Sequence, residues 1–456
     1  MLPEPALPGV PVAFLTEGPA PDVRLDGGPS RLRLLFPLAL AMALSLTGDS
    51  TMYAVLPGQV ETAGITLAVV GILLAANRIV RIPGNMVAGA LFDRFGRRRL
   101  FLGGLILGAA STLSYGLVRG FWPLLGGRVL WGISWSLINV GGYTMVMDRS
   151  SLADRGRMMG LYQLVTAFGL AISPVLGGAL TDAVGFRPAL LICAALSAIG
   201  AVFAAVALPE TRPPGVGREP ARPLLWREWL KHLASTGSHL GRGVFQARYA
   251  CFAVFFVNGG IMVSTLSLYV RQRWGVGISL AGQVVGVATV TGGLLALRSL
   301  VAMAAGPLAG WAADRRWGAI SAASPLGRWL VVWLGLCLGV AGFLVLAVDG
   351  AAWTTAVGVA LVAAGSGAST AGVAALSGDM AADRRPGVAM GSMAAAGDLG
   401  SATGPLVAYA LASRATLSGL YLLCASVLIT ALLLCARVRS APGGADRSGS
   451  DTHTRV

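Results

Sequence analysis

Apolar blocks of about 20 residues, each followed by a short polar segment, recur along the whole chain of 456 residues. A helix needs about 20 apolar residues to cross a hydrocarbon layer roughly 30 Å thick. The pattern therefore predicts an all-α, polytopic membrane protein with twelve transmembrane helices. The predicted spans are residues 34–57, 65–88, 100–118, 122–147, 158–181, 186–208, 249–270, 279–304, 328–348, 352–378, 387–412 and 416–437.

A polar, proline-containing stretch separates the sixth span from the seventh and divides the helices into two sets that repeat each other. The residues that recur 231 positions later are Asp148, Gly160, Gly169 and Pro174, as Asp379, Gly391, Gly400 and Pro405. We expect two pseudo-symmetric six-helix bundles at residues 34–208 and 249–437, with a substrate between them near the membrane midplane. A cytoplasmic linker at 209–248 joins them, and disordered cytoplasmic tails at 1–33 and 438–456 flank them.

The distribution of charge agrees with a membrane protein. Hydrophobic residues make up 55% of the chain and charged residues only 12%, whereas an ordinary soluble domain carries about 25% charged residues. The net charge of +15 is spread over short loops, with 26 Arg and Lys on the side of the N-terminus and five on the other. This bias follows the positive-inside rule. We expect a monomeric, multi-pass protein of the inner cell membrane with both termini in the cytoplasm and no nucleic-acid partner.

Residues suited to catalysis or metal binding are scarce. The five cysteines each lie alone in an apolar block, without a C-x-x-C pair. The three histidines, His232, His239 and His453, fall in the linker or the tail. No nucleotide-binding loop of the G-x-x-x-x-G-K-[ST] type is present. We therefore expect no enzymatic activity, no metal site and no cofactor.

A charged loop follows the second span, where residues 89–99 read GALFDRFGRRR. It is similar to the loop motif G-x-L-x-D-R-x-G-R-R of the major facilitator superfamily, and a degraded second copy begins at Gly310. In that family the loop latches the two halves in the outward-open state. The resemblance implies a conformational latch made by Gly89, Asp93, Arg94, Gly96, Arg97, Asp314, Arg315 and Asp398.

Two further motifs support the resemblance, which covers residues 34–437. The fourth span contains R-x-x-x-G at Arg128 to Gly132, in which the family ties the arginine to proton coupling. The fifth span resembles the antiporter motif G-x8-G-x3-G-P-x2-G-G, with Ser173 in place of one glycine. This motif is enriched in drug/proton exporters. The residues expected to pack helices closely are Gly160, Gly169, Pro174, Gly177, Gly178, Gly400, Gly404 and Pro405.

Charged side chains inside the bilayer cost roughly 3 kcal/mol or more, so each needs a reason. The six in the predicted spans are Asp49, Arg78, Arg81, Arg128, Arg298 and Asp398. The resemblance places spans 1 and 4 at a central cavity, where Asp49 and Arg128 would face each other. Our hypothesis is that Asp49 is the protonatable coupling carboxylate and that Arg128 tunes its proton affinity. The alternative is a static ion pair between helices.

The other intramembrane charges allow two interpretations. Spans 2 and 11 are neighbours across the halves in the family, so an arginine paired with Asp398 would form an interdomain latch. Alternatively, the arginines bind an anion, because Arg298 lies at a depth similar to Arg78 and nitrate carriers hold their anion between arginines of these spans. The six charges sum to +2, which favours a substrate with an anionic group. The residues expected to line the substrate cavity are Tyr53, Arg78, Arg81, Trp131, Trp135, Asn139, Asn258 and Arg298.

These observations predict a secondary active transporter that exports small organic or drug-like molecules in exchange for protons, by alternating access. One alternative is an organic-anion carrier or lipid flippase that uses the membrane arginines. An alternative of another class is a non-transporting membrane sensor or scaffold, which would tolerate substitution of Asp49.

Overall fold

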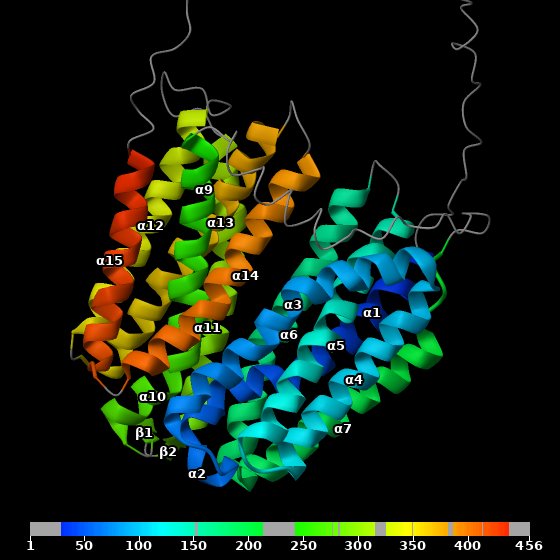
Figure 1. Cartoon of the computed structure of the whole chain (residues 1–456), viewed down its shortest axis with the longest axis horizontal. Coiled ribbons are helices and arrows are strands. Elements are labelled where there is room, and N and C mark those ends of the chain that lie inside the picture. Colours follow the sequence, from blue (N-terminus) through cyan, green and yellow to red (C-terminus); the bar gives the residue numbers. More distant parts are fainter. Residues whose placement is uncertain are drawn as a thin grey trace, which may run out of the picture.

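The computed structural model describes residues 29–150, 154–212, 242–275, 277–280, 283–314, 325–348, 350–381, 386–412 and 414–436. In these residues twelve long helices form two six-helix bundles, as predicted (Figure 1). The helices of the N-terminal bundle are α1 (Pro29–Val55), α3 (Leu67–Arg94), α4 (Arg97–Leu117), α5 (Phe121–Asp148), α6 (Arg155–Val184) and α7 (Phe186–Ala207). Two short elements, η1 (Leu56–Gly58) and α2 (Val60–Ala63), connect α1 to α3.

The C-terminal bundle begins with one long span in three parts, α9 (Arg242–Val254), η2 (Phe255–Met262) and α10 (Val263–Trp274). Its middle part, η2, is a π-helix, whose wide turn occurs often at functional sites. The remaining elements are β1 (Gly277–Leu280), β2 (Gln283–Gly286), α11 (Val287–Asp314), α12 (Pro325–Ala347), α13 (Ala352–Ala381), α14 (Pro386–Leu411) and α15 (Leu417–Ala436).

Apolar composition explains most of these helices. Ten of the described spans are long and apolar enough to cross a membrane by length and composition alone. The other two long helices are α5 and α14, which have 28 and 26 residues and lie among the ten. Both carry an intramembrane charge, Arg128 in α5 and Asp398 in α14. Charge alone does not set these two helices apart, because α1, α3 and α11 also carry intramembrane charges and are among the ten.

Three predicted boundaries differ from the structure. Residues 279–280 and 283–286, expected to begin the eighth span, belong to two antiparallel strands in which Ile278 pairs with Val285. Their β-branched side chains favour strands, and α11 begins only at Val287. Residues 29–33 belong to α1 rather than to a tail, and residues 242–248 belong to α9 rather than to the linker. Residues 1–28, 213–241 and 438–456 of the predicted tails and linker lie outside the described residues.

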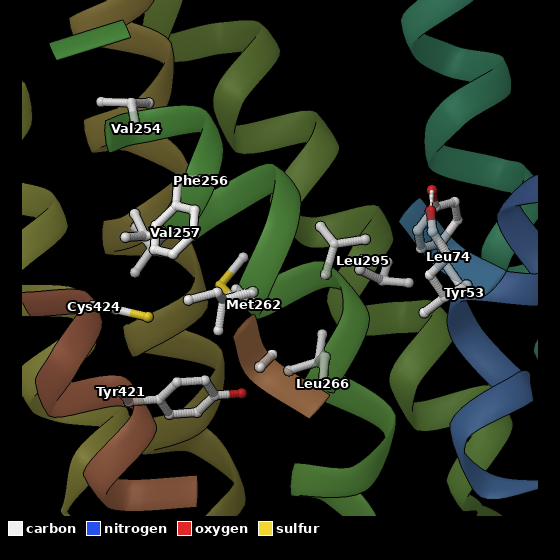
Figure 2. Close-up of a cluster of buried hydrophobic side chains, with 14 of the residues drawn as sticks. Tyr53, Leu74, Val254, Phe256, Val257, Met262, Leu266, Leu295, Tyr421 and Cys424 are labelled. Atoms are coloured by element: carbon white, nitrogen blue, oxygen red, sulfur yellow. Dashed lines mark hydrogen bonds between the residues drawn. The ribbon is translucent and has the colours of Figure 1, made fainter. Parts of the chain in front are cut away.

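The apolar core runs from one bundle into the other. Figure 2 shows Val257 and Met262 of η2 near Tyr421 and Cys424 of α15, with Tyr53 and Leu74 of the N-terminal bundle beyond Leu295. All of these side chains belong to one cluster of buried residues. Tyr421 is fully buried and lies within 3.3 Å of the hydroxyl of Thr265, so its polar group is satisfied inside the core.

The bundles meet at one end and diverge at the other (Figure 1). We call the end where α1 begins and α15 ends the terminal side, and the end with α2 and the β-hairpin the opposite side. The contacts between bundles join α6 to α11 and α3 to α14. On the opposite side, Arg271 donates a hydrogen bond to the carbonyl of Gly58 at 2.7 Å. The interior between the bundles is thus closed on the opposite side.

A carboxylate from one bundle caps a helix of the other at this closure. Asp182 of α6 accepts hydrogen bonds from the backbone amide of Thr289 at 2.8 Å and from its hydroxyl at 2.6 Å. Thr289 lies in the first turn of α11, where backbone amides have no partner within the helix. Gly286 gives Asp182 room, because a Cβ there would collide with the carboxylate.

Candidate functional site

A buried ion pair joins α1 to α5 in the N-terminal bundle. Nη1 of Arg128 lies 2.5 Å from Oδ1 of Asp49, and the Arg128 side chain is completely buried. Nε of Arg128 donates a second hydrogen bond to the carbonyl of Leu73 at 3.0 Å. Gly132, one turn further along α5, permits this approach, because a Cβ there would lie 2.7 Å from the carbonyl of Asn77. The structure thus brings the two predicted coupling residues together.

The ion pair belongs to a larger polar network. The side-chain amide of Asn77 donates to Oδ1 of Asp49 at 3.2 Å and accepts from the hydroxyl of Tyr53 at 3.2 Å. Nε of Arg78 donates to the same hydroxyl at 3.1 Å. The Tyr53 ring lies between two guanidinium groups, 5.1 Å from Arg128 and 5.4 Å from Arg78, in the range of cation–π contacts. Asp49 is therefore connected to Arg78 by hydrogen bonds through two neutral side chains, those of Asn77 and Tyr53.

A second ion pair crosses between the bundles. Nη2 of Arg81 in α3 lies 3.5 Å from Oδ1 of Asp398 in α14. The guanidinium also stands over the ring of Trp135, 5.6 Å from its centroid. About a fifth of each charged side chain is exposed, so the pair borders open space. It occupies the position predicted for an interdomain latch.

The remaining two arginines approach the π-helix from different bundles. Nε of Arg298 in α11 donates to Oδ1 of Asn258 at 2.7 Å. Nη1 of Arg78 lies 3.9 Å from the point where a Cβ on Gly259 would be. Of the six intramembrane charges, Arg128 and Arg81 are paired with carboxylates, while Arg78 and Arg298 have neutral hydrogen-bond partners. The centre of the protein therefore carries two positive charges that these carboxylates do not balance.

The other predicted cavity residues have different surroundings. Trp131 is 1% exposed and packs in the interior of the N-terminal bundle, which corrects its assignment to the cavity surface. Trp135 stacks loosely on it at 6.2 Å and extends the same stripe toward Arg81. Asn139, further along α5, is half-buried.

The charged loop after α3 is held within its own bundle. Nε of Arg97 lies 3.2 Å from Oδ2 of Asp148 at the end of α5. Glu210, after α7, accepts hydrogen bonds from the backbone amides of Arg97 at 3.0 Å and Arg98 at 3.3 Å, and so caps the start of α4. In this state the bundles are separated on the terminal side (Figure 1), so the loop lies away from the C-terminal bundle.

The other predicted latch residues lie at the ends of α3 and α11 and at the start of α4. Gly89 and Asp93 lie in the last two turns of α3, and Asp93 and Arg94 are exposed. The backbone carbonyls of Asp93 and Arg94 accept hydrogen bonds from Arg212. Gly96 precedes α4, where a Cβ would lie 2.8 Å from Glu210. Asp314 ends α11, and Arg315 lies outside the described residues.

The glycine motif of the fifth span packs against two neighbours. A Cβ on Gly178 would collide with the backbone of Ala288 in α11, and one on Gly177 would collide with Thr51 in α1. Gly169 similarly meets Ala43 of α1, while nothing lies within 4 Å of Gly160. Gly292 of α11 packs against the backbone carbonyl of Pro174, with which a Cβ at position 292 would collide.

The counterparts in α14 have the same structural role. Gly400 faces the backbone of Phe252, and Gly404 faces that of Gly260 in the π-helix. Gly71 of α3 packs against the backbone carbonyl of Pro405, with which a Cβ at position 71 would collide. Backbone-to-backbone contact of this kind is how small residues let membrane helices associate.

The sequence profile of the Major Facilitator Superfamily matches residues 38–299 and 288–455. The chain belongs to the Major Facilitator Superfamily. Membership confirms the resemblance seen in the motifs. The two matched segments together cover both bundles.

Curated relatives agree with this membership. The chain is 27% identical over 392 residues to the class C tetracycline resistance protein of Escherichia coli, covering 83% of this chain and 90% of the relative. It is 27% identical over 168 residues to multidrug resistance protein 2 of Bacillus subtilis, covering 37% of this chain and 42% of the relative. An uncharacterized MFS-type transporter of Mycobacterium tuberculosis is 31% identical over 205 residues, covering 43% of this chain. The chain spans only 29% of the length of that mycobacterial relative.

Solved transporters share the fold. A nucleoside transporter, NupG, superposes with a TM-score of 0.69 at 13% identity, covering 90% of this chain and 99% of that one. An inward-facing bacterial homolog of the lysosomal transporter Spinster gives a TM-score of 0.66 at 16% identity, covering 91% of this chain and 100% of that one. The superpositions show that the chain shares the fold of these transporters. At identities this low they carry no information about its substrate.

Several residues of the site escaped the sequence analysis. Asn77 links Asp49 to Tyr53, and its signal is its place at the repeat position that corresponds to Arg298. Glu210 and Arg212 hold the charged loop from a segment that reads as the start of the linker. Asp182 lies just beyond the glycine motif and reads as an ordinary loop acid.

Proposed function

We propose that this transporter exports small organic molecules in exchange for protons, with Asp49 as the group that binds and releases the proton. The buried contact between Asp49 and Arg128 is the observation that carries this proposal. Because arginine stays charged at any accessible pH, protonation of Asp49 leaves a buried cation without its partner. The network through Asn77 and Tyr53 then has reason to rearrange, which is how proton binding would alter the site near Arg78.

The relatives and the glycine motif support the direction of transport. The tetracycline and multidrug resistance proteins carry names that associate them with drug resistance. We place both termini of this chain in the cytoplasm, in line with the distribution of its arginines, and the two bundles as the units that move. The open terminal side of the structure then corresponds to a state that receives substrate from the cytoplasm.

The test is proton-linked transport by the purified protein in liposomes that contain a pH-sensitive dye. A panel of cationic, neutral and anionic organic compounds is offered against an imposed pH gradient. We expect Asp49→Asn to abolish movement driven by the gradient while it retains downhill exchange of the compound. Glu61→Gln, an exposed acid in α2, is the matched control and should transport like the wild type. Gradient-driven accumulation by Asp49→Asn would contradict the proposal, and a protein that moves no compound would favour the sensor alternative.

A second candidate, the carrier of organic anions, is favoured by Arg78 and Arg298. Their neutral partners leave both cations available to an anionic group between the bundles. We expect Arg298→Gln to reduce transport of anionic compounds about tenfold and to spare cationic ones. Arg99→Gln, an exposed arginine at the start of α4, is the control. Equal loss for cations and anions would remove the charge argument.

A further inference from the structure

A long apolar groove runs along the outside of the N-terminal bundle, between α1 and α6 on the terminal side. It encloses about 420 Å³, and its lining includes Leu40 of α1 and Phe168 of α6. The α6 side is a stripe at helical spacing, formed by Leu161, Val165, Phe168, Ile172 and Leu176. Much of this stripe is uncovered, with Phe168 44% and Ile172 60% exposed.

The groove is separate from the central polar site. Asp49 follows Leu40 by nine residues, which is two and a half turns of helix, so the two side chains point to opposite sides of α1. The contact of α6 with α11, through Gly178, uses another face of α6, while Gly169 and Ala43 line the groove where α6 meets α1. The stripe therefore faces the hydrocarbon that surrounds a transmembrane protein.

The chemistry of the lining suits one hydrocarbon chain. Nearly all of the lining side chains are aliphatic or aromatic. The hydroxyl of Thr47, at the far end of the groove, is occupied by a hydrogen bond to the carbonyl of Leu44 at 2.7 Å. Leu161 and Leu176 are separated by about 22 Å along the helix, which exceeds one leaflet's half of a hydrocarbon core roughly 30 Å thick. The groove is thus long enough for a lipid acyl chain from a single leaflet.

A positive charge stands at the mouth of the groove. Arg157 lies one turn before Leu161, on the same stripe of α6, and is exposed. A guanidinium presents a fork of donors that matches the oxygens of a phosphate. Its place near the terminal end of α6 is the level at which a lipid headgroup would sit when its chain enters the groove.

From this combination we infer that the groove binds one acyl chain of an anionic phospholipid, from the leaflet on the terminal side, with the phosphate on Arg157. The lipid fills the gap between α1 and α6 that side chains leave open. It therefore supports the helix that carries Asp49 without entering the transport site. This inference does not depend on the direction or the substrate of transport.

The test measures lipid retention by native mass spectrometry of the full-length protein, titrated with palmitoyl-oleoyl phosphatidylglycerol or palmitoyl-oleoyl phosphatidylcholine. We expect the wild type to bind one phosphatidylglycerol more tightly than phosphatidylcholine. Arg157→Gln should weaken phosphatidylglycerol about fivefold, because one basic residue near an anionic surface contributes a factor of about that size. Leu40→Trp, which fills the groove, should remove binding of both lipids.

Two control variants separate the groove from general effects. Arg99→Gln removes an exposed arginine of α4, and Ile199→Trp enlarges an exposed side chain of α7, 59% of which is accessible. Both should retain lipid like the wild type. Equal affinity of the wild type for the two lipids, or the same losses in the control variants, would overturn the proposal. Displacement of phosphatidylglycerol from the wild type by a transported compound would also overturn it by assigning the groove to substrate.

Discussion

At the scale of the residue, Asp49 and Arg128 differ in how each can respond when the other is removed. Asp49 is able to take up a proton and become neutral, whereas a guanidinium remains charged. Arg128 is completely buried, while 15% of the Asp49 side chain is exposed. The cost of breaking the pair therefore depends on which partner remains.

We predict that Asp49→Leu lowers thermal stability more than Arg128→Leu does. An uncompensated buried charge costs about 3–5 kcal/mol, and only Asp49 escapes this cost by protonation. The double variant should be more stable than the sum of the single losses indicates. Thermal unfolding of the three variants in detergent, at one pH, checks this expectation, and strictly additive losses would show that the pair is not coupled.

At the scale of the element, the contact between α6 and α11 depends on the absence of side chains. Gly178 touches the backbone of Ala288, and Gly292 touches the backbone around Pro174. The polar cap from Asp182 to Thr289 lies directly beyond this contact. Packing and hydrogen bonding thus close the same end of the same helix pair.

Gly178→Ala should impair transport although alanine is the better helix former. Its Cβ would lie 2.6 Å from the carbonyl carbon of Ala288, so α6 and α11 would have to separate on the opposite side. Gly160→Ala is the matched control, since nothing lies within 4 Å of that position, and it should transport normally. Full activity of both variants would show that the close contact is dispensable.

Asp182→Ala should open the opposite side more often. The change removes the acceptor for the amide and hydroxyl of Thr289, while Asp182→Asn retains an oxygen that can accept one of these bonds. A cysteine placed at Val55, which lines a cavity beside Asp182, reports the opening by its reaction with a membrane-impermeant thiol reagent. We expect labelling to become several-fold faster in the alanine variant and to change less in the asparagine variant. Unchanged labelling would assign the closure to helix packing alone.

At the scale of the whole molecule, the two bundles are joined on the opposite side and separated on the terminal side (Figure 1), which under the proposed alternating access is one end of a movement. The other end would require the charged loop near Arg97 to reach the C-terminal bundle. The Arg81–Asp398 pair lies between these two regions and joins the bundles near their middle.

Spin labels placed in pairs test this movement. One pair, at Phe95 and Trp311, reports the terminal side, and a second pair, at Thr62 and Val284, reports the opposite side. Alternating access predicts that the first distance shortens in the same conditions in which the second lengthens. Electron paramagnetic resonance at high and low pH measures both distances. Changes of the same sign would indicate general loosening of the protein.

Much of this arrangement follows from the sequence because lipid imposes strict rules. Charges such as Asp49 and Arg128 need partners inside a membrane, and the internal repeat limits which helices supply them. The bridging role of Asn77 was not foreseeable, because it depends on the rotation of α3 against α1 and α5. Glu210 was missed for a similar reason, since only the folded chain shows that its carboxylate meets the start of α4. The β-hairpin before α11 was missed because the periodicity of a short apolar run does not distinguish a strand from the start of a helix.

The contact between α6 and α11 has a consequence for how the specificity of such a protein can change. This contact is made by glycines and backbone groups, so it contains no side chain that could recognise a transported compound. Under the proposed function, substitutions around Arg78 and Arg298 would change which compound is transported and would leave the contact between α6 and α11 as it is.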